Sequence, residues 1–293
     1  MNTEAPLAQA SPIPVAELIA AAKTLGASGG GTGTAQLLAL LYDDAVDVGQ
    51  VLKRLNAEPT LAARVLKVAN SPFYRCAGTV GTVERAVQLL GLSAIRGIAA
   101  AGCMDRMPMP ALAKALDAEQ FARHSLAVGV AAQALSRRVG AGVEAEAFMA
   151  GLLHDIGIVL LARLRPQAVA AVAKLPMPDA ATGLRAERDF IGAEHTSCAA
   201  LLAQTWGLPP WLVQALQAHH TPQTEVRVTG HEALPALLAL ADQAACEAGI
   251  GLWPLCASPV PAGCSASLGL SPEAFREVTD SLPDAVRELS AAV

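Results

Sequence analysis

The sequence predicts an all-α protein, and three observations lead to that prediction. The 293 residues are 53% hydrophobic but include few aromatic residues, namely five Phe, three Trp and two Tyr. Ala and Leu, which favour helices, dominate instead of the Val, Ile and aromatic residues that favour sheets. Apolar residues recur at the three- and four-residue spacing of a helix face, and we find no convincing strand alternation and no internal repeat.

The N-terminal part is expected to begin with a loosely held leader, residues 1–33, which ends in the glycine-rich run Gly26–Gly33. Helical spacing starts at Thr34 and continues from there. The first helices are indicated by short apolar faces and by start and stop residues. They are a face of Leu37, Leu40 and Leu41, a helix opened by Pro59–Thr60 with Leu61, Val65 and Val68, one over Val83–Leu90 stopped by Gly91, and one capped by Ser93 with Ile95 and Ile98.

Two prolines in Met107–Pro110 mark a break between an N-terminal and a larger C-terminal helical half. In the second half we expect helices at about residues 112–139, 144–164, 166–174, 183–205, 210–219 and 231–248. A loop-like segment, 251–268, then precedes a last helix that Ser271–Pro272 starts and that runs to about residue 290. The predicted divisions are therefore 1–33, 34–108, 109–250 and 251–293.

Charge and cysteine usage limit the classes of partner. The net charge is −5 and the pI is about 5.7, and no basic cluster with interleaved aromatics is present, which argues against nucleic acid. The charge-free stretches 196–218 and 248–272 are interrupted by Pro, Gly or Gln, so we predict no membrane span. Six cysteines without a Cys-x-x-Cys pair, and no visible secretory signal, indicate reduced thiols and a cytoplasmic location.

The strongest functional signal is an ordered series of histidines and aspartates. Successive groups are separated by about one helix or helical hairpin, and chance must supply every member at that spacing. Imidazole with carboxylate suits Fe, Mn, Zn or Ni better than Ca or Mg, so the series predicts a divalent transition-metal site. Its members are His124, His154, Asp155, His195, His219, His220 and Asp242.

The adjacent pair His154–Asp155 carries a geometric requirement. Neighbouring residues on a helix diverge by about 100°, so both side chains reach one ion only near a bend or a helix end. Gly157 makes such a local adjustment plausible. Taken singly, a helical histidine such as His124 is more often a hydrogen-bonded core or surface residue, and His219–His220 alone is readily explained as a helix C-terminal cap favoured by the dipole.

Several separated motifs give the chain a resemblance to the HDOD family, the HD-related output domain of bacterial signalling proteins. The resemblance covers residues 34–248 and implies an HD-superfamily helical bundle with an N-terminal helical subdomain. In the N-terminal half it is carried by residues 44–48, 58–61, 69–74 and 86–92. In the C-terminal half it is carried by residues 123–125, Gly151–Gly157, and Glu194–His195 followed by Trp206–Pro209.

The resemblance also implies roles for the site residues. In the wider HD superfamily of metal-dependent phosphohydrolases, one ion would be held by His124, His154, Asp155 and Asp242. The HD-GYP branch, which hydrolyses cyclic dinucleotides, has three further histidines for a second ion, and His195, His219 and His220 match those positions. Asp155 would then bridge two ions, with Fe or Mn favoured and Zn or Ni possible, and metal-bound hydroxide would be the nucleophile.

This sequence departs from the HD-GYP pattern at two places. Ile158 stands where a lysine usually follows His-Asp-x-Gly, and Thr221-Pro-Gln-Thr224 replaces the Gly-Tyr-Pro motif. Because those elements are associated with substrate phosphate contacts, hydrolysis of cyclic di-GMP is in doubt even where metal binding is not.

Three hypotheses about function remain open at this point. The first is a metal-dependent phosphohydrolase of the phosphodiesterase kind that acts on a nucleotide or cyclic dinucleotide. The second is a signalling module that binds a nucleotide or a protein partner without turnover, for which Asn70–Tyr74 is a candidate ordered turn. The third is a structural helical scaffold whose histidines bond internally, which is disfavoured by the cost of burying polar rings without a shared partner.

Overall fold

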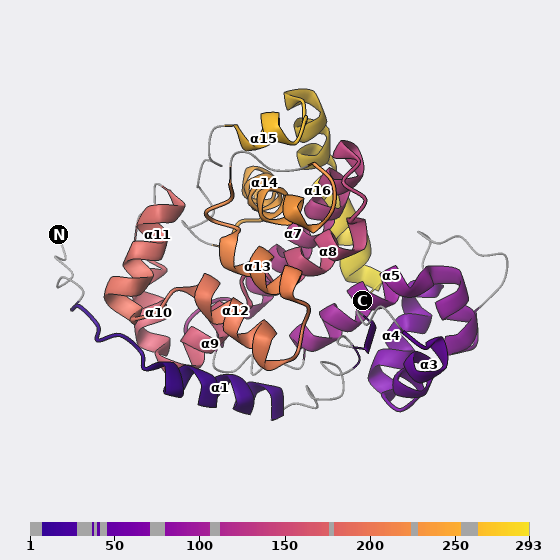
Figure 1. Ribbon diagram of the computed structural model, residues 1–293, viewed down its shortest axis with the longest axis horizontal. Coiled ribbons are helices and arrows are strands. Elements are labelled where there is room, and N and C mark those ends of the chain that lie inside the picture. Colours follow the sequence, from indigo (N-terminus) through magenta and orange to yellow (C-terminus); the bar gives the residue numbers. More distant parts are fainter. Residues whose placement is uncertain are drawn as a thin grey trace.

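The computed structural model describes residues 8–27, 37, 40–41, 46–70, 80–105, 112–175, 179–223, 228–252 and 263–292. Every regular element in these ranges is a helix, which confirms the predicted all-α class (Figure 1). The principal helices are α1 (Val15–Ala27), α3 (Val48–Asn56), α4 (Pro59–Ala69), α5 (Val83–Asp105), α7 (Ala118–Val139), α8 (Glu144–Leu153), α9 (Ile156–Leu164), α10 (Pro166–Val172), α11 (Ala180–Ala186), α12 (His195–Thr205), α13 (Pro210–Ala218), α14 (Leu234–Glu247), α15 (Cys264–Ser267) and α16 (Pro272–Ala292).

The central layer is formed by α7 and α8, which pack along one another, with α14 and α16 against α7. Helices α9, α12 and α13 continue this layer, and α3, α4 and α5 form a separate group that reaches it through α5 and α8 (Figure 1). Most side chains of the α8 and α9 stretch are buried. This stretch, Glu144–Leu164, is long and apolar enough to cross a membrane, but 83% of its most apolar window is buried inside the protein. It is therefore an interior element of this fold.

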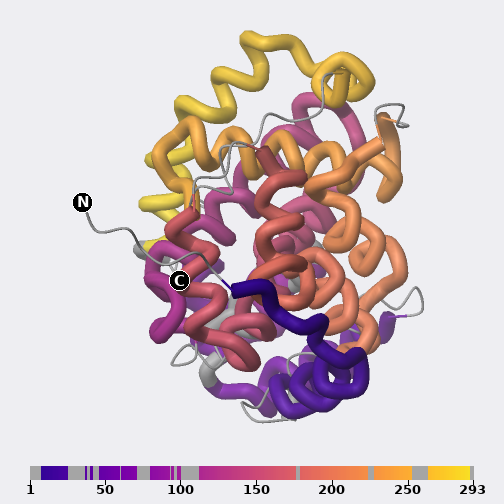
Figure 2. The backbone as a smooth tube through the Cα atoms, turned by 90° about the vertical axis from the view of Figure 1, so that its left-hand side faces the viewer, coloured from indigo at the N-terminus to yellow at the C-terminus, as the bar shows by residue number. Residues whose placement is uncertain are grey.

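The N-terminal segment differs from the expected loose leader. Residues 15–27 form α1, which lies across α9 and α12 and buries Ala22 and Leu25 (Figure 2). Ile13, just before the helix, is also buried. Residues 15–27 are thus helical and packed, because the fold supplies an apolar surface for their short apolar face to cover. Most of that glycine run lies outside the described residues.

Two long helices expected from spacing are each divided. The stretch 144–164 is interrupted at His154–Asp155, and the stretch 183–205 is interrupted by a π-helical turn, η1 (Glu187–Ile191), and by Gly192 with φ 94°. Apolar periodicity passes through both interruptions because the residues on each side are buried. Hydrophobic spacing alone therefore does not show where these helices end.

Smaller differences concern helix ends. Helix α7 begins at Ala118, capped by Asp117, and not near residue 112. Residues 264–267 form the short α15 within the segment expected to be loop-like. Gly91, with φ 74°, interrupts α5 as predicted, and Ser271 Oγ accepts a hydrogen bond from the backbone N–H of Ala274 at the start of α16. Within the described part of the chain, Cys198, Cys246 and Cys264 are not joined by disulfide bonds.

Candidate metal centre

The break between α8 and α9 turns two adjacent side chains into the same interior space. His154 is the residue after the last turn of α8, and Asp155 precedes α9 with φ −97° and ψ 9°. Both are buried. A continuous helix would direct them about 100° apart. The predicted bend at this pair is therefore present, and it allows one cluster to use both residues.

Glycines allow the helices around this break to approach closely. A Cβ atom on Gly157 would lie 1.9 Å from the backbone oxygen of His195, and one on Gly151 would lie 2.7 Å from Cα of Gly129. Helix α9 therefore meets the start of α12, and α8 meets α7, at backbone contact. Gly157 permits this close approach, which brings His195 next to Asp155.

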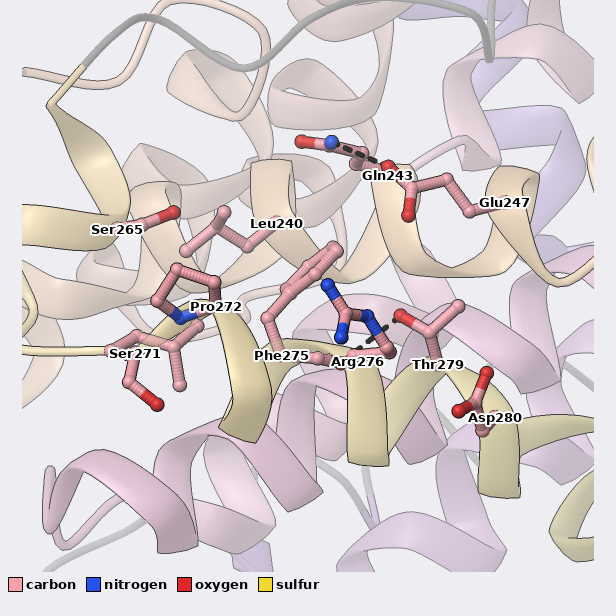
Figure 3. Close-up of a pocket in the computed structure, with 11 residues that line it drawn as sticks. Leu240, Gln243, Glu247, Ser265, Ser271, Pro272, Phe275, Arg276, Thr279 and Asp280 are labelled. Atoms are coloured by element: carbon pink, nitrogen blue, oxygen red, sulfur yellow. Dashed lines mark hydrogen bonds between the residues drawn. The ribbon is translucent and has the colours of Figure 1, made fainter.

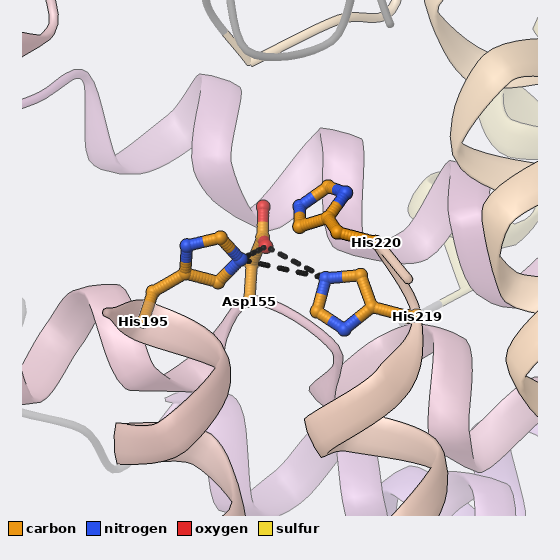
Figure 4. Close-up of side chains that lie close together, drawn as sticks. All are labelled: Asp155, His195, His219 and His220. Carbon is orange, nitrogen blue, oxygen red and sulfur yellow. Dashed lines mark hydrogen bonds and ion pairs between the residues drawn. The ribbon is translucent and has the colours of Figure 1, made fainter. Parts of the chain in front are cut away.

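The five predicted histidines lie around the Asp155 carboxylate, and Asp242 joins the cluster through His124. His124 comes from the middle of α7, His195 begins α12, and Asp242 lies on α14. His219 and His220 follow the last turn of α13. Figure 4 shows the imidazoles of His195, His219 and His220 directed toward Asp155.

The two oxygens of Asp155 face different pairs of imidazoles. Its Oδ2 lies 3.2 Å from Nε2 of His154 and 3.7 Å from Nε2 of His124. Its Oδ1 lies 3.4 Å from Nε2 of His195 and 3.9 Å from Nε2 of His219. A carboxylate placed in this way can contribute one oxygen to each of two neighbouring ions.

Four imidazoles share one arrangement of their two ring nitrogens. In each, Nδ1 lies 2.8 or 2.9 Å from an oxygen that only accepts, so this nitrogen carries the proton and Nε2 faces the cluster. The acceptors are the backbone oxygens of Ile250, Gly151 and Leu216 for His124, His154 and His219, and the Glu187 carboxylate for His195. Fixing Nδ1–H in this way is typical of histidines that bind a metal through Nε2.

The distances between ring nitrogens fit a shared ion better than a direct contact. Nε2 of His124 lies 3.3 Å from Nε2 of His154, and Nε2 of His195 lies 3.4 Å from Nε2 of His219. Two nitrogens that are each about 2.1 Å from one ion lie about 3.0 Å apart at a right angle and about 3.4 Å apart at a tetrahedral angle. Asp242 extends the first pair, because its Oδ1 lies 3.4 Å from Nε2 of His124.

The protonation of the cluster follows from burial and from its carboxylates. Burial lowers the pKa of His154, but Asp155 and Asp242 outweigh this effect and raise that pKa to about 9. Burial likewise lowers the pKa of His195, and Glu187 and Asp155 raise it to about 9. Because Nδ1 already carries a proton in both rings, the additional proton belongs to Nε2, the nitrogen that faces the cluster. A divalent cation would compete with these protons.

Three other groups of the cluster have lowered pKa values. Burial and the neighbouring His195 lower the pKa of His220 to about 3. Burial and His220 hold the pKa of His219 well below its usual value. Burial raises the pKa of Asp155, but His154, His195 and His124 outweigh it and hold that pKa well below its usual value. Two groups of these donors are close enough to hold an ion: His124, His154 and Asp155, and Asp155, His195, His219 and His220.

Comparison with models of protein families identifies one that matches this chain. The model of the HDOD domain matches residues 33–222, which is more than half of the chain. The chain belongs to the HDOD family. Comparison with curated proteins gives no match.

Solved structures with the same fold resemble this HDOD protein along most of its length. A candidate phosphohydrolase from Shewanella amazonensis SB2B is 24% identical with a TM-score of 0.67, and the match covers 94% of this chain and 98% of that one. An HDOD domain protein of unknown function from Geobacter sulfurreducens is 22% identical with a TM-score of 0.66, covering 95% and 98%. A candidate signal transduction protein from Marinobacter aquaeolei VT8 is 25% identical with a TM-score of 0.65, covering 88% and 57%.

One carboxylate of the HDOD cluster was missed by sequence reasoning. Glu187 is 1% exposed, and its oxygens accept hydrogen bonds from both Nδ1 and the backbone N–H of His195. In the single helix that was expected over residues 183–205, Glu187 would lie about 12 Å along the axis from His195. The π-helical turn η1 and Gly192 bring Glu187 into contact with His195, and the spacing of residues in the sequence does not predict this contact.

The two departures from the HD-GYP pattern fall in α9 and directly after His220. Ile158 is buried in the first turn of α9, where it adds no charge. Thr221 and Pro222 follow His220 directly, without regular structure. The candidate turn at Asn70–Tyr74 lies outside the described residues from Ser71 onward.

Asn70 itself is a structural residue. Its Oδ1 accepts a hydrogen bond from the backbone N–H of Val80, and its Nδ2 donates to the backbone oxygens of Val80 and Leu66. It therefore joins the end of α4 to the residues that precede α5.

A cavity of about 550 Å³ lies elsewhere, between α14, α15 and α16 (Figure 3). Leu240 and Phe275 supply part of its apolar wall, and Gln243 donates a hydrogen bond to Glu247 at its edge. None of the seven cluster residues lines this cavity. It shares only helix α14 with the metal centre, through the adjacent residues Asp242 and Gln243.

Proposed function

We propose that this HDOD protein is a cytoplasmic signalling protein that binds two divalent metal ions and, with them bound, hydrolyses a phosphodiester of a nucleotide. One observation carries the proposal: four imidazoles fixed at Nδ1 direct Nε2 toward a carboxylate whose two oxygens face different pairs of them. Nε2 of His124 and Nε2 of His154 face one another at 3.3 Å, so a proton or a cation must lie between them, and in the proposal a metal ion displaces that proton.

The proposed first position uses His124, His154, Asp242 and Oδ2 of Asp155. The proposed second position uses His195, His219, His220 and Oδ1 of Asp155. Nitrogen and carboxylate donors without a thiolate favour Fe or Mn, with Zn and Ni as the alternatives, over Ca or Mg. Two metal positions would explain why Asp155 lies between the two pairs of imidazoles, with one oxygen facing each pair.

Ions held here would withdraw charge from a phosphoryl oxygen and acidify a water molecule beside it. The residues of the chain prepare the site for that chemistry. The Nδ1–H hydrogen bonds fix each imidazole tautomer and its direction, so that little reorganisation accompanies binding. The burial of His124, His154, His195 and His219 keeps bulk water from these ligands. The nucleotide substrate is proposed from the resemblance to the HD superfamily.

A second candidate function is a signalling module that binds metal and a nucleotide or protein partner without turnover. The observation that favours it is the buried Ile158, which stands where a charged side chain would face a substrate phosphate in the HD-GYP pattern. The N-terminal helices α3, α4 and α5 add a helical group beyond the cluster, which suits a regulatory role.

Two measurements test the proposals in order. Elemental analysis of the purified protein by mass spectrometry is expected to give close to two transition-metal ions per chain, and the absence of bound metal would refute both candidates. The loaded protein is then assayed against cyclic dinucleotides and a generic aryl phosphodiester. Turnover that Asp155→Ala abolishes supports hydrolysis, whereas two bound ions with no turnover supports the binding module.

A further inference from the structure

One imidazole of the cluster differs from the others in what holds it. Nδ1 of His124, His154 and His219 donates to backbone oxygens, which carry no net charge. Nδ1 of His195 lies 2.8 Å from each oxygen of the Glu187 carboxylate. A carboxylate on the far nitrogen makes an imidazole more basic and a stronger ligand than a backbone carbonyl does. The two proposed metal positions are therefore not equivalent, although both have nitrogen-rich ligands.

Glu187 is placed for this one contact. It is 1% exposed, and one of its oxygens also accepts the backbone N–H of His195 at 2.8 Å, at the start of α12. A carboxylate is costly to bury unless its oxygens are hydrogen-bonded, and here both oxygens of Glu187 are hydrogen-bonded to His195. These contacts fix both the ring and the backbone of that residue.

The π-helical turn η1 makes the contact possible. Glu187 begins the turn, its backbone oxygen accepts the N–H of Gly192 at 2.9 Å, and Gly192, with φ 94°, ends the turn three residues before His195. Single π-helical turns occur often at functional sites because they redirect a side chain without ending the helix. Arg188 forms an ion pair with Glu194 across the same turn.

The N-terminal segment holds the far side of this turn. Nη1 of Arg165 donates to the backbone oxygens of both Ser11 and Ile191, at 2.9 and 3.0 Å. The backbone N–H of Ile13 donates to the oxygen of Gly192, where a Cβ atom would lie 2.4 Å from the oxygen of Ser11. The segment then continues into α1 across α9 and α12 (Figure 2). The turn is thus fixed from outside as well as by its own hydrogen bonds.

We propose that Glu187 is a positioning residue that sets the affinity of the second metal position, the one formed by His195, His219, His220 and Oδ1 of Asp155. This inference rests on the proposed dinuclear function. Its consequence is selective: loss of the Glu187 carboxylate weakens the second ion by roughly 10- to 100-fold and leaves the first ion unchanged. A merely structural role would weaken both positions together or neither.

The test is a calorimetric titration of metal-free full-length protein with Mn²⁺, together with metal content after dialysis. Wild type is compared with Glu187→Gln, which keeps the size of the side chain and removes its charge. Glu194→Gln is the matched control, because it removes the same charge one residue from His195. The Glu194 carboxylate forms an ion pair with Arg188 and does not contact the imidazole of His195. If Glu187→Gln loses its helical circular dichroism, Glu187→Asp replaces it, since this variant keeps the charge and withdraws it from the ring.

We expect wild type and Glu194→Gln to bind two ions with the same affinities. Only the Glu187 variant is expected to bind the second ion more weakly. Unchanged binding of two ions by a folded Glu187 variant would overturn the inference and leave the proposed function intact. Equal weakening in Glu194→Gln would also overturn it, because net charge alone would then explain the effect. A wild type that binds fewer than two ions overturns the dinuclear function itself.

Discussion

Replacement of Asp155 by Asn is the most direct perturbation of the metal centre. Asn keeps the size of the side chain but removes the negative charge and one oxygen acceptor. The two Asp155 oxygens now lie 3.2 Å from Nε2 of His154 and 3.4 Å from Nε2 of His195, so the substitution affects both proposed positions at once. We therefore expect both ions to be weakened, in contrast to a substitution that touches one position.

The magnitude follows from the place of Asp155 as a direct ligand in both positions. Substitution of a group behind a metal ligand costs about 10- to 100-fold in affinity, so loss of a shared ligand should cost at least about 100-fold at each position. At a metal concentration of about 100 times the dissociation constant, each bound ion stabilises the folded wild type by about 2.7 kcal/mol. At about 2 °C per kcal/mol for a chain of this size, each ion should raise Tm by about 5 °C, and Asp155→Asn should lose that increase.

The assay is thermal unfolding with and without Mn²⁺, followed by circular dichroism, and metal content after dialysis. Asp117→Asn is the matched control, because Asp117 caps α7 away from the cluster and Asn caps a helix as well as Asp does. The control should keep two ions and the full increase in Tm. If Asp155→Asn retained both ions and the wild-type response to metal, the proposal that this carboxylate bridges two positions would be wrong.

Three further predictions follow from the same geometry. Gly157→Ala should destabilise the fold by about 3 kcal/mol or more in urea unfolding, because its Cβ would meet backbone atoms of α12. The control Gly81→Ala, with open space around the residue, should change stability by no more than about 0.5 kcal/mol. Equal loss of stability in the two variants would contradict the close approach of α9 and α12. Metal affinity should rise as pH increases from 6 toward 9, because His154 and His195 each have a pKa of about 9 and a proton on either Nε2 must leave before an ion binds there. Calorimetry in buffers of different ionisation enthalpy measures the released protons, and an affinity independent of pH would contradict this prediction. Asn70→Ala should lower the free energy of unfolding by about 1–3 kcal/mol in the same urea assay, since it removes three hydrogen bonds between the Asn70 side chain and backbone groups. An unchanged stability would show that water replaces these bonds.

Most residues of the cluster could be predicted from the sequence because imidazole and carboxylate side chains are recognisable as metal ligands by residue type. Imidazoles and carboxylates inside apolar helices are costly without a common partner, so their ordered recurrence predicted that they meet, and the structure brings all seven together. The need for a bend at His154–Asp155 also followed from helix geometry alone, and the break between α8 and α9 is present there.

The helical class and the donor set could be predicted from residue types and their short-range periodicity. The groups that hydrogen-bond to those donors could be identified only in the folded chain. Glu187 reaches His195 through a π-helical turn, and the N-terminal segment folds back on that turn. The physical reason is that the spacing of apolar residues reports burial, and a buried chain keeps that spacing whether its helix continues, bends or reverses.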